Sequence, residues 1–354
     1  WIYPFSFSSC RQWFNCCGQN DSESMKIGTL GTSQITQQFI ETTQQVANCM
    51  VIACCSRELS KAKELAERFN VEDFYNDFDQ MCKDGKIDTV YIACPNHYHY
   101  SYAKKALLHN LNVIVEKPFT SNYTEACKLI ELAKSKKKYL FEAMPILYSK
   151  EYKQFKKYVS ELQDIKIINA NYSQRSRKYD EVLVNKIPNS FDIKQSGGAL
   201  MDLNIYNIHA LVDLFGEPKE CFYHANKIEN GIDTSGIAIL SYEDKQAVCT
   251  AAKDSTSPNY FEVQGNNGYV NIIGGINFGE TIFSSIHKEE ILYTLKQERL
   301  KNEIVYINEL VNLNDLEMCY SILEHTKKVM KVCDRLRDSA GVEFNADKEE
   351  IYIF

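Results

Sequence analysis

The feature that most restricts the fold of this chain is an alternation of strand-like and helical stretches that begins at Met25. Residues 25–31 form an apolar run typical of a strand, residues 33–46 carry apolar side chains at helical spacing, and residues 49–56 form a second apolar run. Further strand-like stretches follow, each separated from the last by a helical one. Such alternation is typical of a doubly wound parallel sheet with crossover helices. We therefore expect residues 25–145 to form an α/β domain of the Rossmann type.

From about residue 146 the pattern changes to strand-like stretches separated by polar turns, with a few helices. The strand-like stretches are residues 166–174, 236–242, 246–253, 259–273 and 289–297. A large, mainly antiparallel open sheet in an α+β domain fits this pattern best. We expect residues 146–354 to form this domain and, through a sheet face that helices leave uncovered, to associate as a homodimer or homotetramer.

The composition argues against several classes of protein. The 354 residues are 44% apolar and 25% charged, and the formal net charge of -7 gives no general attraction for nucleic acid or anionic lipid. No apolar run is long enough to span a membrane. The 13 cysteines are scattered and form no CxxC pair, which favours a reducing, cytoplasmic location. No set of His, Cys and acidic residues has zinc spacing, so no metal is expected.

The first 24 residues stand outside this pattern. They contain one cation and no long apolar run. We interpret residues 1–24 as an N-terminal extension, either disordered or artificially added ahead of a start at Met25; a targeting or docking tail is the alternative.

The turn "GTLGTSQIT" after the first strand is close to the phosphate-binding turn of dinucleotide-binding domains. In that turn the first glycine makes the tight bend, the second lets the pyrophosphate approach the backbone, and the third allows close helix packing. Here these positions are Gly31, Ser33 and Thr36. The serine hydroxyl can still donate to a phosphate oxygen, and the helix amides still point at an anion. The turn alone leaves two interpretations, a nucleotide site or a strand-turn-helix unit without a ligand.

Two later strands end in residues suited to a ligand site. One strand leads into Cys94, Pro95 and Asn96, and the next ends at Glu116 and Lys117. In an open parallel sheet the ligand lies at the carboxyl ends of the strands, so Lys117 is well placed to meet a cofactor and a substrate. The alternative is that Glu116 and Lys117 are a solvated pair in a loop.

A largely apolar helix is predicted over residues 198–215. It carries Asp202, Tyr206, His209 and Asp213 at positions i, i+4, i+7 and i+11, which share one face. Because most other positions are apolar, this polar stripe must face either solvent or a polar cavity.

Three motifs, "ACPNHYH", "EKPF" and "GGALMDLNIYNIH", together resemble the Gfo/Idh/MocA family of oxidoreductases. The resemblance covers essentially all of residues 25–354 in order and spacing. It implies an NAD(P)-dependent dehydrogenase or reductase that transfers a hydride between nicotinamide and a CH-OH or C=O group of a sugar, polyol or dihydrodiol-like substrate. The second domain would then bind the substrate, with the loop 173–195 as one wall. The alternative is a catalytically idle NADP-binding sensor or structural protein of the same fold, which the departure at Ser33 favours.

The resemblance places the catalytic positions of the family at Lys117, Asp202 and Tyr206, with Tyr206 where inositol dehydrogenases carry histidine. We interpret Tyr206 as the group that accepts or donates the proton, Lys117 as the group that tunes it and binds the reacting oxygen, and Asp202 as an orienter; the Tyr and Lys roles are exchangeable. Free Tyr and Lys have pKa values near ~10 and ~10.4, so we expect the ammonium to lower the tyrosine pKa and desolvation to lower the lysine pKa. His209 and Asp213 are interpreted as supports.

The end of the second strand indicates which nicotinamide cofactor is held. Where NAD enzymes place Asp or Glu on the ribose 2′-OH, this chain has Ser56 followed by Arg57. Both can bind a 2′-phosphate, so we predict NADP, with NAD as the alternative. In the other interpretation they are a helix cap and a surface cation. His99 matches the "PNxxH" of the family and either contacts the cofactor or only stabilises local packing. The expected cofactor-binding residues are Gly31, Thr32, Ser33, Gln34, Ile35, Ser56, Arg57, Cys94, Pro95, Asn96, His99, Glu116 and Lys117.

Overall fold

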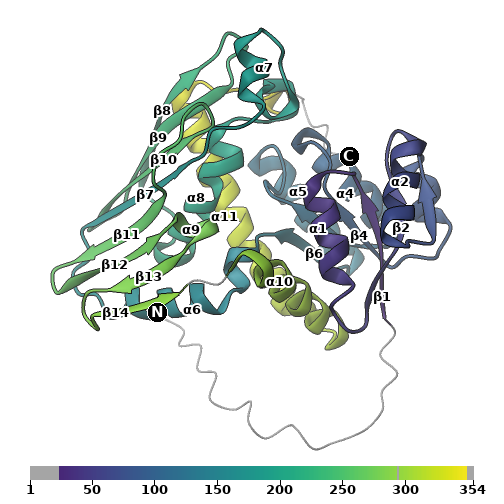
Figure 1. Ribbon diagram of the computed structural model, residues 1–354, viewed down its shortest axis with the longest axis horizontal. Coiled ribbons are helices and arrows are strands. Elements are labelled where there is room, and N and C mark those ends of the chain that lie inside the picture. Colours follow the sequence, from purple (N-terminus) through teal and green to yellow (C-terminus); the bar gives the residue numbers. More distant parts are fainter. Residues whose placement is uncertain (1–23, 293–294, 349–354) are drawn as a thin grey trace, which may run out of the picture.

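Two sheets, with helices packed between and around them, dominate the computed structural model, which describes residues 24–292 and 295–348 (Figure 1). The expected N-terminal extension therefore lies outside the described residues, apart from Ser24.

The first sheet is parallel throughout. Its described strands, in the order β3-β2-β1-β4-β5-β6, are β1 (Met25–Leu30), β2 (Cys49–Cys55), β3 (Asp73–Tyr75), β4 (Thr89–Ile92), β5 (Asn112–Glu116) and β6 (Leu140–Ala143). The helices that follow them are α1 (Gln34–Thr43), α2 (Leu59–Phe69), α3 (Phe78–Lys83), η1 (Asn96–Tyr98), α4 (His99–Leu108) and α5 (Tyr123–Lys136). This doubly wound topology confirms the prediction. The strand order reverses between β1 and β4, the point at which such sheets bind ligands.

The second sheet is mainly antiparallel, as predicted, and only its β7–β10 pair is parallel among the described strands. In the order β14-β13-β12-β11-β7-β10-β9-β8, the strands are β7 (Ile167–Ser173), β8 (Glu220–Lys227), β9 (Asp233–Ser241), β10 (Gln246–Ala252), β11 (Tyr260–Gly265), β12 (Gly268–Ile273), β13 (Thr281–Ser284) and β14 (Glu289–Leu292). The sequence pattern does not predict β8 and β13.

The strand predicted over residues 289–297 is confirmed over Glu289–Leu292 and wrong from Leu295. Helix α10 (Leu295–Asn312) begins there. Its buried residues Leu300, Ile304 and Ile307 recur at helical spacing, so the 3.6-residue period prevails over the short strand-like run.

The remaining helices lie against the second sheet or between the two sheets. They are η2 (Pro145–Tyr148), α6 (Lys150–Ser160), α7 (Tyr179–Leu183), η3 (Asn189–Phe191), η4 (Ile193–Gln195), the π-helix η5 (Leu200–Asn204), α8 (Ile205–Phe215), α9 (Gly275–Phe278), α11 (Leu316–Ala340) and α12 (Asn345–Lys348). None of the helices in the described parts combines the length and apolarity needed to cross a membrane.

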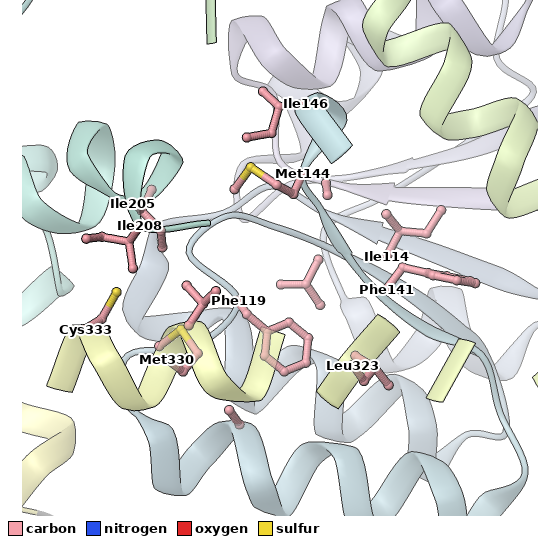
Figure 2. Packing of buried hydrophobic residues seen from close by; sticks show 14 of the residues in the cluster. Ile114, Phe119, Phe141, Met144, Ile146, Ile205, Ile208, Leu323, Met330 and Cys333 are labelled. Carbon is pink, nitrogen blue, oxygen red and sulfur yellow. The ribbon is translucent and has the colours of Figure 1, made fainter. Parts of the chain in front are cut away.

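Helix α11 joins the two halves of the molecule. It packs on β8 and α8 on one side and on α5 and β6 on the other. A single buried apolar cluster runs through both halves, and Figure 2 shows part of it, with Phe119 and Phe141 gathered near Leu323 and Met330 of α11. Apolar packing thus sets how the two sheets sit against each other. The domain boundary near residue 145 stays a prediction.

Among the described residues, helices cover only one face of the second sheet (Figure 1). Its other face exposes apolar side chains that are 39% to 51% accessible: Ile167, Phe222, Ile237, Tyr260, Tyr269 and Ile273. Cross-strand pairs such as Tyr260 with Ile273 place them on the same side of the sheet.

Candidate active site

The β1–α1 turn depends on its first glycine. Gly31 has φ +117, and a Cβ there would lie 2.4 Å from the carbonyl oxygen of Ala93, so only glycine fits. Ser33 has φ -69 and ψ 169, which any residue can adopt, so the backbone at this position does not need a second glycine. Thr36, at the third position, is buried, and its Oγ1 lies 3.2 Å from the hydroxyl of Ser33. The turn therefore keeps its geometry despite the departures from the fingerprint.

The end of β2 presents Ser56 and Arg57 as expected, with Arg57 exposed. Glu58 follows at the N-cap of α2, and its carboxylate binds the Lys61 ammonium at 2.6 Å. Lys61, which would otherwise add positive charge near Arg57, is thus paired with a carboxylate. Arg57 remains the cation closest in sequence to the strand end.

A cavity of about 510 Å³ opens at the carboxyl ends of β4 and β5, against the N-terminus of α1. The expected site residues that line it are Ser33, Ile35, Cys94, Pro95, Asn96, His99, Glu116, Lys117, Asp202 and Tyr206. The expected residues outside its lining are Gly31, Thr32, Gln34, Ser56 and Arg57. The cavity therefore gathers the expected residues from the ends of β4 and β5 and from the second half of the chain, while the others lie in the β1–α1 turn and at the end of β2.

The centre of the cavity is an ion-pair triad. The Lys117 ammonium binds Asp202 Oδ1 at 2.8 Å and the carbonyl oxygen of Asp202 at 2.8 Å. Lys253, at the end of β10, binds Asp202 Oδ2 at 2.7 Å. Lys117 Nζ also lies 4.9 Å from the centre of the Tyr206 ring. The structure thus brings the three expected catalytic residues together and adds a second lysine.

Burial and the neighbouring charges set the pKa values of Lys117, Asp202 and Tyr206. Burial alone would lower the pKa of Lys117, but the Asp202 carboxylate raises it above its ordinary range. Burial raises the pKa of Tyr206 and outweighs the opposing effect of the Lys117 ammonium. Both expected pKa shifts are therefore wrong in direction. The sequence reveals neither the ion pair of Lys117 with Asp202 nor the extent to which Tyr206 is buried. Although burial would raise the pKa of Asp202, its two lysines hold it well below the usual value.

Glu116 and His99 make contacts that fix the strand ends. Glu116 Oε1 accepts a hydrogen bond of 2.6 Å from the Tyr91 hydroxyl, and burial raises the pKa of Glu116. The ring nitrogens of His99 lie 2.8 Å from the Pro118 carbonyl oxygen and 2.9 Å from that of Cys94. His99 therefore links the ends of β4 and β5. These contacts agree with the alternative that His99 stabilises local packing. The residue also borders the cavity.

The four polar residues of the predicted helix do not all face the same environment. Its first turn is a π-helix, η5, and only Asp202 and Tyr206 reach the cavity. Asp213, about 16 Å along the axis from Asp202, binds Lys156 at 2.8 Å and the Tyr152 hydroxyl at 2.9 Å. His209 is buried, and the expectation that it faces solvent or a cavity is wrong.

His209 takes part in a polar network below the site. Its Nε2 lies 3.3 Å from Glu142 Oε1, and its Nδ1 lies 3.1 Å from His325 Nε2. The same Glu142 oxygen accepts the backbone N–H of Phe119, two residues after Lys117. The interpretation of His209 as a support agrees with these contacts, since the network holds the segment that carries Lys117.

Several residues that line the cavity are not predicted from the sequence. From the expected wall 173–195 come Lys178, Asn189, Ser190 and Gln195; from elsewhere come Tyr172, Lys253, Asn277 and Arg299. The wall prediction is thus confirmed for that loop. Lys253 and Arg299 are single cations after an apolar strand and inside a helix, so no local motif distinguishes them. Among the described residues, no three His, Cys or acidic side chains are placed to hold a metal ion.

Comparison with known proteins shows the family of the chain. Residues 25–144 match the family described as "Oxidoreductase family, NAD-binding Rossmann fold", and residues 154–271 match the "GFO/IDH/MocA C-terminal domain". The fold and the site therefore define an oxidoreductase with a Rossmann-type nucleotide-binding domain. More narrowly, the chain belongs to the Gfo/Idh/MocA family.

Individual relatives extend over most of the chain. It is 29% identical over 337 residues to "scyllo-inositol 2-dehydrogenase (NADP(+)) IolU" of Bacillus subtilis, a match covering 92% of this chain and 99% of that enzyme. It is 28% identical over 258 residues to "Trans-1,2-dihydrobenzene-1,2-diol dehydrogenase" of Xenopus tropicalis, covering 70% of this chain and 74% of that enzyme. The fold is similar to that of KijD10, a 3-ketoreductase from Actinomadura kijaniata solved with NADP and TDP-benzene. That match has a TM-score of 0.78 at 19% identity and covers 89% and 97% of the two chains.

Proposed function

We propose that this chain is an NADP-preferring oxidoreductase that transfers a hydride between nicotinamide and a CH-OH or C=O group of a sugar, polyol or dihydrodiol-like substrate. The observation that carries this proposal is the meeting of Lys117, Asp202 and Tyr206 in one cavity at the carboxyl ends of β4 and β5. The names of the Bacillus and Xenopus relatives support a polyhydroxylated ring as substrate.

The residues at the β1–α1 turn fit a dinucleotide. The close approach of Gly31 to Ala93 leaves no room for a side chain, and the exposed N-terminus of α1 offers backbone amides to a pyrophosphate. Ser56 and Arg57 at the end of β2 fit a 2′-phosphate. In this proposal Thr32, Ser33, Gln34 and Ile35 hold the pyrophosphate.

The cofactor preference has a direct test in Arg57. We expect Arg57→Ala to weaken NADPH binding by about 10-fold or more while leaving NADH binding nearly unchanged, because a charge-assisted contact to the phosphate is lost. Lys63→Ala, on the same helix and paired with Glu67, is the matched control. Dissociation constants from fluorescence titration give the result, and an unchanged ratio of the two constants in Arg57→Ala would rule out this reading of the strand end.

The chemistry assigned to the protein groups follows from their protonation. When bound, the nicotinamide ring supplies or accepts the hydride. The protonated Lys117 holds the reacting oxygen of the substrate and stabilises the negative charge that develops on it. The Tyr206 hydroxyl donates a proton to this oxygen in reduction, and its deprotonated form receives the proton in oxidation. Asp202 holds Lys117 in place through both of its contacts with the ammonium.

The alternative, a catalytically idle NADP-binding protein, is separated from an enzyme by turnover. The experiment measures NADPH binding by fluorescence and then NADPH consumption with a panel of aldehydes, ketones and sugars. Consumption with at least one class of carbonyl compound is the expected result. Tight binding with no consumption across the panel would favour the sensor, for which the geometry at Lys117 and Tyr206 gives no support.

The uncovered face of the second sheet supports association as a homodimer or homotetramer. Six apolar side chains on this face are 39% to 51% exposed, and association with a second copy would take them out of water. A second copy offers the same face, so a twofold arrangement would bury both.

A further inference from the structure

Lys253 lies where the second sheet meets the loop 173–195, here called the wall loop. It directly follows β10, and its backbone N–H donates to the carbonyl oxygen of Thr234 in β9 at 2.8 Å. Its own carbonyl oxygen accepts the backbone N–H of Ser176, near the start of the wall loop, at 2.8 Å. Because both backbone groups are bonded to neighbouring segments, the side chain of Lys253 starts from a fixed point.

The side chain of Lys253 is held as firmly as its backbone. Only 2% of the residue is exposed, and its ammonium binds Asp202 Oδ2 at 2.7 Å. The ammonium also donates to the Ser190 carbonyl oxygen in η3 at 3.0 Å and lies 4.7 Å from the centre of the Phe191 ring. A carboxylate, a carbonyl oxygen and an aromatic face therefore fix the position of this charge.

Asp202 depends on its lysines, because packing alone does not hold its carboxylate. The side chain of Asp202 is 37% exposed and opens onto the cavity. It belongs to the π-helix η5, a form that occurs mostly at functional sites. Lys117 binds Oδ1 and Lys253 binds Oδ2. With one lysine on each oxygen, the carboxylate cannot rotate without breaking an ion pair.

Lys117 takes its position from Asp202. Its ammonium binds both Oδ1 and the carbonyl oxygen of Asp202, and it lies 4.9 Å from the centre of the Tyr206 ring. The lysine side chain is long and flexible, so a rotation of the carboxylate would carry the ammonium away from the reacting oxygen. A displacement of about 1 Å at a reacting centre can lower the rate by about 10²-fold.

We propose that Lys253 is a positioning residue: it fixes Asp202, through Asp202 it keeps Lys117 directed at the reacting oxygen, and it ties both to the wall loop at Ser190. This inference rests on the oxidoreductase function proposed above. Two ammonium groups that share one carboxylate repel each other, and unfavourable local arrangements of this kind are typical of functional sites. Lys253 also lines the cavity, so direct binding of the substrate is the competing role.

Two substitutions separate the charge of Lys253 from its hydrogen bond to the wall loop. Lys253→Met removes both, whereas Lys253→Gln keeps a neutral donor for Ser190. We expect both variants to lower kcat by about 10- to 100-fold and to leave the NADPH dissociation constant within about threefold, because Lys117 loses its alignment. Lys253→Arg keeps the charge and should exceed both variants in kcat by about threefold or more. Unaltered kcat in Lys253→Gln would show that Lys253 only anchors the wall loop, and would overturn the inference.

Lys245→Met is the matched control. Lys245 lies just before the other end of β10, its side chain is 16% exposed, it pairs with Asp244, and it is outside the cavity lining. Its removal thus also takes away a largely buried, ion-paired lysine. The control should keep kcat within about twofold of the unaltered protein. Equal losses of kcat in Lys245→Met and Lys253→Met would show a general loss of structure and contradict the proposal.

A double-mutant cycle tests whether Lys253 acts through Asp202. In an Asp202→Asn background the carboxylate is already lost, so adding Lys253→Met should lower kcat by less than about threefold further, with KM unchanged. A further loss as large as the loss that Lys253→Met causes by itself would show that Lys253 acts on the substrate directly. That result would overturn its assignment as a positioning residue.

Crystal structures separate failure of this inference from failure of the proposed function, because they require no turnover. In the NADPH complex of Lys253→Met, or of Lys253→Gln if the first variant does not fold, the Lys117 ammonium should be displaced by about 1 Å. In Lys245→Met it should not move. Such a displacement in a protein that turns over no substrate would count against the oxidoreductase activity and for the role of Lys253. An unchanged contact between Lys117 and Asp202 would overturn the inference.

Discussion

Lys117 and Tyr206 both retain their protons at neutral pH, and this affects the two directions of reaction differently. The pKa values of both groups lie above their ordinary ranges, through Asp202 for the lysine and through burial for the tyrosine. In carbonyl reduction both groups are ready to donate. In the proposed mechanism of alcohol oxidation Tyr206 must first lose its proton, so only a small fraction of the protein would be competent at neutral pH.

A pH profile tests this difference. Alcohol oxidation should rise with pH, by up to about tenfold per unit, across roughly pH 6 to 9, because the tyrosinate fraction grows below a raised pKa; reduction should be nearly flat over the same range. Tyr206→Phe should lower kcat by about 10² to 10⁴ and remove the slope. A plateau of oxidation near pH 7 would show that another group is the base.

At the scale of elements, the conformation of the β1–α1 turn depends mainly on one residue, Gly31. Gly31→Ala places a methyl group within 2.4 Å of the Ala93 carbonyl oxygen and must shift the end of β4 or the start of α1. We expect NADPH binding to weaken by about 10-fold or more, with some loss of stability, since strain of this kind costs on the order of 1–3 kcal/mol.

Gly85→Ala is the matched control for this prediction. Gly85 also has a positive φ, +69, but a Cβ there meets nothing within 4 Å. It should therefore cost some stability and leave NADPH binding unchanged. Titration of both variants gives the comparison, and equal NADPH affinities in the two would show that the close approach at Gly31 does not shape the cofactor site.

The elements also show which parts of the fold and the site could be predicted from the sequence. Buried parallel strands are continuous apolar runs, so the first sheet could be predicted strand by strand, and the strand ends located Lys117. Asp202, which pairs with Lys117, lies 85 residues away in the sequence. Only the family resemblance, and not the spacing, indicates that the two residues share a site. Lys253 and Arg299 carry no such motif, because only the assembled topology brings β10 and α10 to the cavity. The predicted directions of the pKa shifts of Lys117 and Tyr206 are wrong for the same reason, because ion pairing and burial depend on the assembled fold.

At the scale of the whole molecule, the proposed association depends on the uncovered face of the second sheet. Phe222 and Ile237 lie on neighbouring strands of that face and are 51% and 45% exposed. The double variant Phe222→Lys, Ile237→Lys should be monomeric in light scattering at micromolar concentration, while the unaltered protein is a dimer or tetramer, because like charges would meet across a twofold axis. Glu220→Lys, at the edge of the same face, is a control that changes the net charge by the same two units. A monomer already in the unaltered protein would disprove the association.

The central claim is that the cavity around Lys117 is where hydride transfer is assisted. Lys117→Ala tests it most directly, because Lys253 still pairs with Asp202 and the carboxylate does not lose its last partner. The measurement is NADPH consumption with a substrate that the unaltered protein turns over, alongside the NADPH dissociation constant of the same preparation. We predict that turnover is lost while the dissociation constant stays within several-fold. Near-normal turnover in Lys117→Ala with intact cofactor binding would contradict the claim.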